Sequence, residues 1–154
     1  MEIRKATMDN FEELLQLKLE SKEDERAYNK LLEPVDKVKA NYKEYLEKDI
    51  KGEWRAAIIA IENKKIIGMV IGRIYRSLRV AGYERRASMG NLYVKPEYRK
   101  KGMAKKLIEA FTDWAKSKEV KRITLSVYID NKQVQDMYKK LGFKENNISM
   151  HKKI

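Results

Sequence analysis

The sequence has 154 residues, of which 43% are hydrophobic and 38% charged, so it can bury a sizeable core and is neither disordered nor fibrous. Its net charge of +12 favours anionic partners such as a nucleotide cofactor or nucleic acid, although such an excess can equally serve solubility. The absence of cysteine excludes disulfides, thiolate metal sites and a cysteine nucleophile.

Neither a secretion signal nor a membrane segment is predicted. Residues 1–5 lack the apolar core of a signal peptide, and the longest apolar run, residues 56–61, has the length of a strand. We expect one cytoplasmic domain over residues 1–154, monomeric or homodimeric, with no membrane partner. His151 is the single histidine, so a histidine-based metal site or catalytic triad is unsupported and no metal is expected.

The first half of the chain predicts a short strand, two helices and a hairpin. A strand around Ile3 precedes a helix that Thr7 or Asp9 caps and whose apolar side is formed by Phe11, Leu14, Leu15 and Leu19. Charge dominates residues 21–30, which predicts a loop or a frayed helix. A second helix starts at Pro34 and ends at residues 51–52, and strands at residues 55–61 and 66–75 form a hairpin.

The second half predicts a strand–helix–strand crossover and a closing helix. Residues 76–86 are polar and basic, with Gly82 as a break, and precede a long strand at residues 87–94. A helix with an apolar stripe starts at Met103, and strands follow at residues 123–129 and 148–154, on either side of a last helix that Asp130 or Asn131 caps and Gly142 ends. Because crossovers join parallel strands and hairpins join antiparallel ones, we expect an α/β fold with a mixed sheet.

The junction at residues 99–104, Arg-Lys-Lys-Gly-Met-Ala, lies between the long strand and the helix that starts at Met103. Such a junction points free backbone N–H groups at one place, where the helix dipole adds positive potential. Gly102 lets an anion approach the backbone, and the three cations raise the potential further. The pattern predicts a phosphate or pyrophosphate site. It is neither a P-loop nor a dinucleotide fingerprint, because the glycines and the Lys-Ser/Thr pair of those motifs are absent.

This junction resembles the pyrophosphate loop of the GNAT superfamily of N-acetyltransferases, which reads Arg/Gln-x-x-Gly-x-Gly/Ala. Arg99, Gly102 and Ala104 occupy its fixed positions, and the preceding strand, the element order and the spacing of the last helix extend the resemblance over residues 1–143. It implies a single-domain GNAT-like α/β fold with flanking helices. The mixed central sheet of that fold is splayed at the cofactor site, between the strands that end at residues 94 and 129.

The resemblance also implies an N-acetyltransferase that moves the acetyl group of acetyl-CoA directly to a primary amine, of a protein N-terminus, a lysine or a small molecule. Tyr138 matches the general acid that assists departure of the thiolate, with a core aromatic residue as the alternative. Asn131 matches a cofactor contact, with a helix cap as the alternative. The implied cofactor-binding residues are Leu92, Tyr93, Val94, Arg99, Lys100, Lys101, Gly102, Met103, Ala104, Lys105 and Asn131.

The sequence departs from the family at the general base. Many members carry a glutamate on the strand before the loop, whereas this chain has Met89, Gly90 and Asn91 there. Deprotonation is then left to an ordered water or to a residue elsewhere. Two rival functions stay open: a GNAT-like module that binds CoA without transfer, and a basic nucleic-acid-binding domain, which is less favoured.

Three further groups have both a functional and a structural interpretation. An acidic patch either receives a cationic amine or forms a solvated loop: Glu20, Glu23, Asp24 and Glu25. Four tyrosines either line an acceptor pocket or pack in the core: Tyr28, Tyr75, Tyr83 and Tyr93. Four arginines either meet nucleic acid or lie on the surface: Arg76, Arg79, Arg85 and Arg86.

Overall fold

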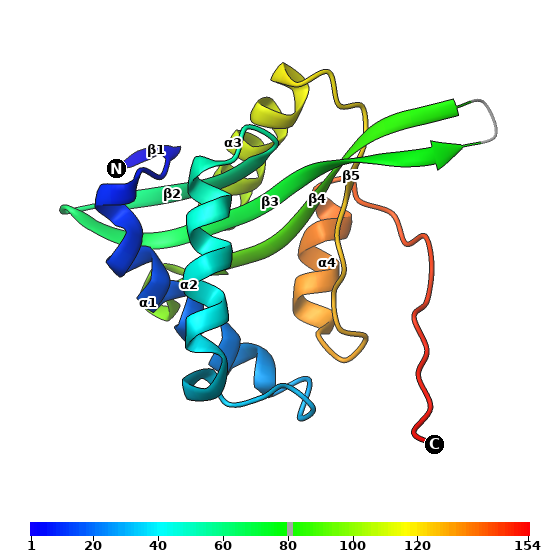
Figure 1. Ribbon diagram of the computed structural model, residues 1–154, viewed down its shortest axis with the longest axis horizontal. Helices are drawn as coiled ribbons and strands as arrows, with labels where there is room; N and C mark the ends of the chain where they lie inside the picture. Colours follow the sequence, from blue (N-terminus) through cyan, green and yellow to red (C-terminus); the bar gives the residue numbers. More distant parts are fainter. Residues whose placement is uncertain (80–81) are drawn as a thin grey trace.

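The computed structural model describes residues 1–79 and 82–154, with the backbone alone for residues 77–79 and 83, so the side chains of Arg79 and Tyr83 lie outside the description (Figure 1). At its centre is a five-stranded sheet in the order β1-β2-β3-β4-β5. The strands are β1 (Glu2–Lys5), β2 (Arg55–Glu62), β3 (Lys65–Arg79), β4 (Gly82–Val94) and β5 (Ile123–Thr124).

Helices cover both faces of the sheet, and each face has its own hydrophobic cluster (Figure 1). On one face lie α1 (Phe11–Arg26) and α2 (Val35–Lys51), and on the other lie α3 (Met103–Ser117) and α4 (Lys132–Lys140). Two 3₁₀ turns, η1 (Met8–Asn10) and η2 (Pro96–Tyr98), precede α1 and the loop before α3. No helix in the described part of the chain is long and apolar enough to cross a membrane.

β2 shows why a continuous apolar run forms a central strand here. Successive side chains of a strand point to opposite faces, so a strand buried on both faces needs apolar residues at every position. Ala56 and Ile58 pack in the cluster with α3, while Ala57 and Ile59 pack in the cluster with α1 and α2. All four are at most 3% exposed. The two-layer burial confirms the predicted α/β class.

The sheet is mixed, and its parallel pair is short. β1, β2, β3 and β4 pair antiparallel with their neighbours, whereas β4 and β5 pair in parallel through Ala87 with Ile123 and Ser88 with Thr124. Directly after this pair the register of β4 against β3 shifts by one residue at Gly90. Because a bulge bends its strand and increases the local twist, β4 turns away from β5 at this point. The sheet is therefore open where the resemblance implied a splay.

Two segments in the middle of the chain are more regular than the sequence indicated. Of the two forms expected from residue 21 onward, a loop or a frayed helix, residues 21–26 show the helix: they continue α1, and the Lys22–Glu25 and Glu23–Arg26 ion pairs at i,i+3 spacing stabilise its end. The polar and basic segment at residues 76–86 was expected to precede the strand at residues 87–94. Within the described residues it belongs to β3 and β4, which pair from Ile74–Ala87 out to Arg79–Gly82.

Two expectations about strands near the C-terminus are wrong. β5 ends at Thr124 instead of reaching residue 129, because the bulge in β4 removes its pairing partner. Residues 148–154 form no strand, although apolar and polar residues alternate there. Ile148 and Met150 are 77% and 89% exposed, since a strand pattern folds only where a neighbouring edge supplies hydrogen bonds.

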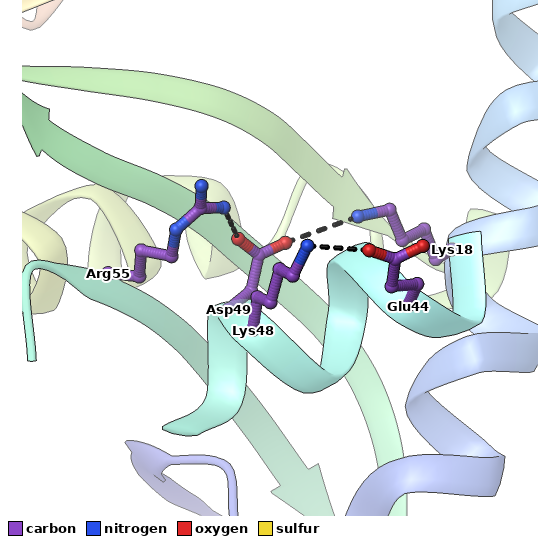
Figure 2. Close-up of polar contacts among 5 residues, drawn as sticks. All are labelled: Lys18, Glu44, Lys48, Asp49 and Arg55. Atoms are coloured by element: carbon purple, nitrogen blue, oxygen red, sulfur yellow. Dashed lines mark hydrogen bonds and ion pairs between the residues drawn. The ribbon is translucent and has the colours of Figure 1, made fainter. Parts of the chain in front are cut away.

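A buried ion cluster joins α1, α2 and β2 (Figure 2). Asp49 of α2 accepts from Lys18 Nζ of α1 at 3.4 Å and from Arg55 Nη1 at the start of β2 at 2.9 Å. Lys18 and Asp49 are 5% and 7% exposed. Burial lowers the pKa of Lys18, and the Asp49 carboxylate opposes that effect. The cluster fixes the position of α1, whose C-terminal end approaches the candidate site.

Candidate active site

The expected phosphate cradle is a left-handed loop between η2 and α3. Lys100 and Gly102 have positive φ angles of 60° and 75°. A Cβ at Gly102 would meet no heavy atom within 4 Å, so a side chain would fit there without a clash. Glycine is favoured because of the positive φ angle. In the described parts of the chain, the backbone N–H groups of residues 100–105 donate to no protein acceptor. These free donors at the start of a helix fit the oxygens of a pyrophosphate.

Arg99 is held differently from the rest of the cradle. Its backbone N–H donates to Pro96 O at 3.2 Å, so it is not among the free donors. Its side chain turns back toward β4 and α1: Nε donates to Val94 O at 2.8 Å and Nη2 to Asp24 at 2.9 Å. The guanidinium also lies 5.3 Å from the centre of the Tyr93 ring. Arg99 therefore links the end of β4 to α1.

The open edge of β4 adjoins the cradle. From Met89 to Val94 the strand pairs with β3, while its pairing with β5 ends at Ser88. The side chains of Tyr93 and Val94 are 8% and 7% exposed and pack on opposite faces of the sheet. These side chains are therefore core, and what the open edge offers to a ligand is the main chain.

Tyr138 lies on the buried side of α4. Its residue is 9% exposed, shares a core cluster with Met89 and Val94 of β4, and its ring meets Phe143 edge-on at 5.5 Å. Among the described residues its hydroxyl has no hydrogen-bond partner, yet it is not one of the fully buried polar atoms. Burial raises the pKa of Tyr138 to about 12. The phenol is thus protonated at neutral pH and free to donate.

Asn131 is the N-cap of α4. Its Oδ1 accepts from the Val134 N–H at 3.4 Å, so the capping role that the sequence suggested is observed. Its Nδ2 makes no hydrogen bond in the described part of the chain, which leaves a donor for a second role.

Comparisons with known proteins decide the family. The family described as "Acetyltransferase (GNAT) family" matches residues 12–143. The chain belongs to the GNAT acetyltransferases. Members of this family use acetyl-CoA as the acetyl donor, so the expected enzyme class and cosubstrate are confirmed.

Relatives and solved structures agree with this assignment. The chain is 30% identical over 105 residues to N-alpha-acetyltransferase 30 of Schizosaccharomyces pombe, covering 66% of this chain and 67% of that protein. It is 32% identical over 62 residues to a putative ribosomal protein bS18-alanine N-acetyltransferase of Bacillus subtilis, covering 40% and 41%. An aminoglycoside N-acetyltransferase solved with CoA shares the fold, with a TM-score of 0.78, 19% identity and coverage of 99% and 93%.

The GNAT chain has no carboxylate of its own at the position of the usual base. Of the carboxylates near that position in the sequence, Glu84 lies on β4 and pairs with Arg86 at 3.1 Å, and Glu97 lies in η2. In the described residues no group of three His, Cys, Asp or Glu side chains could hold a metal ion. The amine must therefore lose its proton to water or to a group outside the position that the family pattern marks.

The acidic patch of this GNAT domain consists mostly of paired side chains. Asp24 pairs with Arg99, Glu25 with Lys22 and Glu23 with Arg26. They lie on the last turns of α1 and serve as links between elements as well as solvated charges.

The three tyrosines of this set whose side chains the structure describes do not gather in one pocket. Tyr28 stacks on Tyr128 at a centroid distance of 6.2 Å, and Tyr93 is buried beside Arg99. Tyr75 is 37% exposed, and its hydroxyl lies 3.4 Å from Thr124 Oγ1. Sequence reasoning missed Tyr128, which contacts α1 from a position 103 residues away from Glu25. No local pattern marks such a contact.

Among the basic side chains of the hairpin, Arg85 and Arg86 both have intramolecular partners. The Arg85 guanidinium lies 4.7 Å from the centre of the Trp54 ring and pairs with Glu119 at 3.7 Å. Arg86 pairs with Glu84. These contacts favour a structural interpretation of the two arginines over a nucleic-acid surface.

Proposed function

We propose that this GNAT protein transfers the acetyl group of acetyl-CoA directly to the α-amino group of a protein or peptide. The observation that carries the proposal is the run of free N–H groups at residues 100–105 beside the open edge of β4, with Tyr138 in the same core cluster as Val94 and Met103. Bound acetyl-CoA supplies a thioester whose acetyl carbon accepts the amine.

Different residues bind the cosubstrate and assist the transfer. Lys100, Lys101 and the helix start bind the pyrophosphate through backbone N–H groups and positive potential, while the main chain of Leu92 and Val94 aligns the pantetheine. Tyr138 donates a hydrogen bond to the sulfur as it gains charge. With no cysteine in the sequence there is no thiol nucleophile, which supports direct transfer over an acyl-cysteine intermediate.

The acceptor class rests on the sequence relatives. Of the two relatives described above, one is named an N-alpha-acetyltransferase and the other an alanine N-acetyltransferase of a ribosomal protein, at 30% and 32% identity. The aminoglycoside enzyme shares 19% identity, which carries the fold and no acceptor. A peptide α-amine is therefore the first candidate, and lysine side chains and small amines are the alternatives.

The experiment measures thiol release from acetyl-CoA with matched acceptors. A short peptide with a free α-amine is compared with the same peptide blocked at its N-terminus but carrying a lysine, and with a polyamine and an aminoglycoside. We expect turnover with the free α-amine peptide and its loss on blocking. Turnover with the small amines alone would overturn the acceptor class, and CoA binding without turnover on any acceptor would favour the CoA-binding module.

A further inference from the structure

The C-terminal end of α1 reaches the end of β4. Asp24 Oδ2 accepts from Arg99 Nη2 at 2.9 Å, and the same guanidinium donates through Nε to Val94 O at 2.8 Å. Arg99 in turn lies over the ring of Tyr93. One side of the opening between β4 and β5 is thus tied to α1.

The residues that follow Asp24 reach the other side of the opening. Tyr128, in the segment between β5 and α4, donates its hydroxyl proton to Glu25 Oε1 at 2.8 Å and accepts from Asn29 Nδ2 at 3.2 Å. Its ring is stacked on Tyr28 with an angle of 9° between the planes. Burial is the main cause that raises the pKa of Tyr128, so the hydroxyl keeps the proton that it donates to Glu25.

Tyr128 is also fixed to the helix that carries Tyr138. Its carbonyl accepts from Gln135 Nε2 of α4 at 2.9 Å and from the backbone N–H of Asn131 at 3.0 Å. A displacement of Tyr128 therefore displaces the start of α4. Figure 1 shows the end of α1 and the turn before α4 on the same side of the molecule.

We propose that residues 24–29 form a strap across the opening between β4 and β5, and that Tyr128 is a positioning residue which sets the width of the acetyl-CoA slot. The inference rests on the proposed function, because it takes that opening to be the slot. β4 and β5 lose their mutual hydrogen bonds after Ser88 and Thr124, so contacts through other elements must hold the two sides at a fixed distance. The strap supplies such contacts to both sides.

A strap that preorganises the slot acts on cosubstrate binding. Without it, part of the binding free energy is used to bring β4 and the start of α4 to the correct separation. Loss of one hydrogen bond to a charged group therefore raises the Kd for CoA by about tenfold. The same loss leaves kcat at saturating acetyl-CoA within about twofold, because in the saturated enzyme β4 and the start of α4 are at the correct separation with or without the strap.

The test uses the variants Tyr128→Phe, Glu25→Gln and the double substitution in the full chain. Tyr128→Phe keeps the ring stacked on Tyr28, and Glu25→Gln keeps the size of the side chain. Glu44→Gln is the matched control, since Glu44 pairs with Lys48 on the exposed side of α2 (Figure 2). The Kd for CoA is measured by isothermal titration calorimetry, together with KM and kcat for acetyl-CoA and the melting temperature.

We expect each single variant to raise Kd and KM about tenfold, the double variant to add little more, and Glu44→Gln to match the wild type. The strap would be overturned by an unchanged Kd in both single variants, or by a double variant whose increase in Kd is the product of the two single increases. A variant with a lower melting temperature and a wild-type Kd would overturn it as well. A wild type that binds no CoA overturns the proposed function and the strap together. A wild type that binds CoA and acetylates no amine overturns the proposed transfer and favours a CoA-binding module, and its Kd series still decides the strap.

Discussion

Replacing Tyr138 by phenylalanine removes one hydroxyl from α4 and leaves the ring that packs against Phe143. The hydroxyl has no hydrogen-bond partner among the described residues, so its removal leaves no buried group unsatisfied. We expect the free energy of unfolding to change by less than about 0.5 kcal/mol. Any loss of activity then reports on the chemistry and not on the fold.

The expected decrease in kcat of Tyr138→Phe follows from the pKa of Tyr138. Burial raises it to about 12, whereas an ordinary thiol has a pKa near 8.5. Complete transfer of the phenol proton to a thiolate is then uphill by about 5 kcal/mol, at 1.36 kcal/mol for each pKa unit. The hydroxyl therefore stabilises the thiolate as a hydrogen-bond donor, with a contribution of about 1.5–3 kcal/mol. The expected decrease in kcat is about 10- to 150-fold, toward the lower end of general acid catalysis.

The assay is thiol release at saturating acetyl-CoA, with KM for acetyl-CoA measured in parallel. Tyr45→Phe, at an exposed tyrosine on α2, is the control and should match the wild type. A kcat of Tyr138→Phe equal to that of the wild type would refute the role of this hydroxyl.

The raised pKa of Tyr138 also fixes a pH dependence. Since the phenol keeps its proton up to about pH 12, it contributes no fall in kcat/KM between about pH 7 and 10. The folded protein holds this proton more tightly than the unfolded chain, so its free energy of unfolding decreases as the pH rises from about 10 to 12. An alkaline limb near pH 9 that vanishes in Tyr138→Phe would contradict this reasoning.

Other substitutions test the cradle, the ion cluster and the core. Gly102→Ala places a Cβ on a residue with a φ of 75°, at a cost of about 1–2 kcal/mol, and should raise the KM for acetyl-CoA severalfold. Gly102→Asn should raise this KM less, and an equal KM for the wild type and both variants would contradict the role of the left-handed conformation. Asp49→Asn leaves the buried Lys18 without its anion and should lower the free energy of unfolding in urea by about 3–5 kcal/mol, whereas a loss below about 1 kcal/mol would refute a buried pair. Gly72→Ala would place its Cβ 2.4 Å from Ser88 O and should lower the melting temperature, while Gly90→Ala, with 3.5 Å to Ile71 O, should not; equal melting temperatures would contradict the packing.

The cradle and α3 could be predicted because their signals are local. Gly102 and the apolar stripe that begins at Met103 lie within one strand–loop–helix unit, and the structure starts α3 at Met103. The mixed sheet followed from the hairpin and the crossover, which are also read from neighbouring segments. The free N–H groups of the loop then follow from the geometry of any helix start.

The contacts that organise the other side of the site could not be predicted in this way. Lys18 and Asp49 are 31 residues apart, and Glu25 and Tyr128 are 103 apart, so no spacing rule connects them. One signal was present: Lys18 lies between Leu17 and Leu19, all three of which are buried, and a lysine there requires an anion. The short β5 depended on the bulge at Gly90, which one isolated glycine does not reveal.

The brevity of the parallel pair between β4 and β5 has a consequence for the lifetime of the protein. Two residue pairs join these strands, so the segment that follows β5 has few main-chain links to the sheet, and we expect it to open more easily than the paired strands. A molecule that binds only the folded form disfavours this opening by mass action. At a concentration a hundredfold above its Kd, it adds about 2.7 kcal/mol to the free energy of unfolding. The acetyl-CoA supply would then set how fast proteases remove the enzyme, as well as how fast the enzyme works.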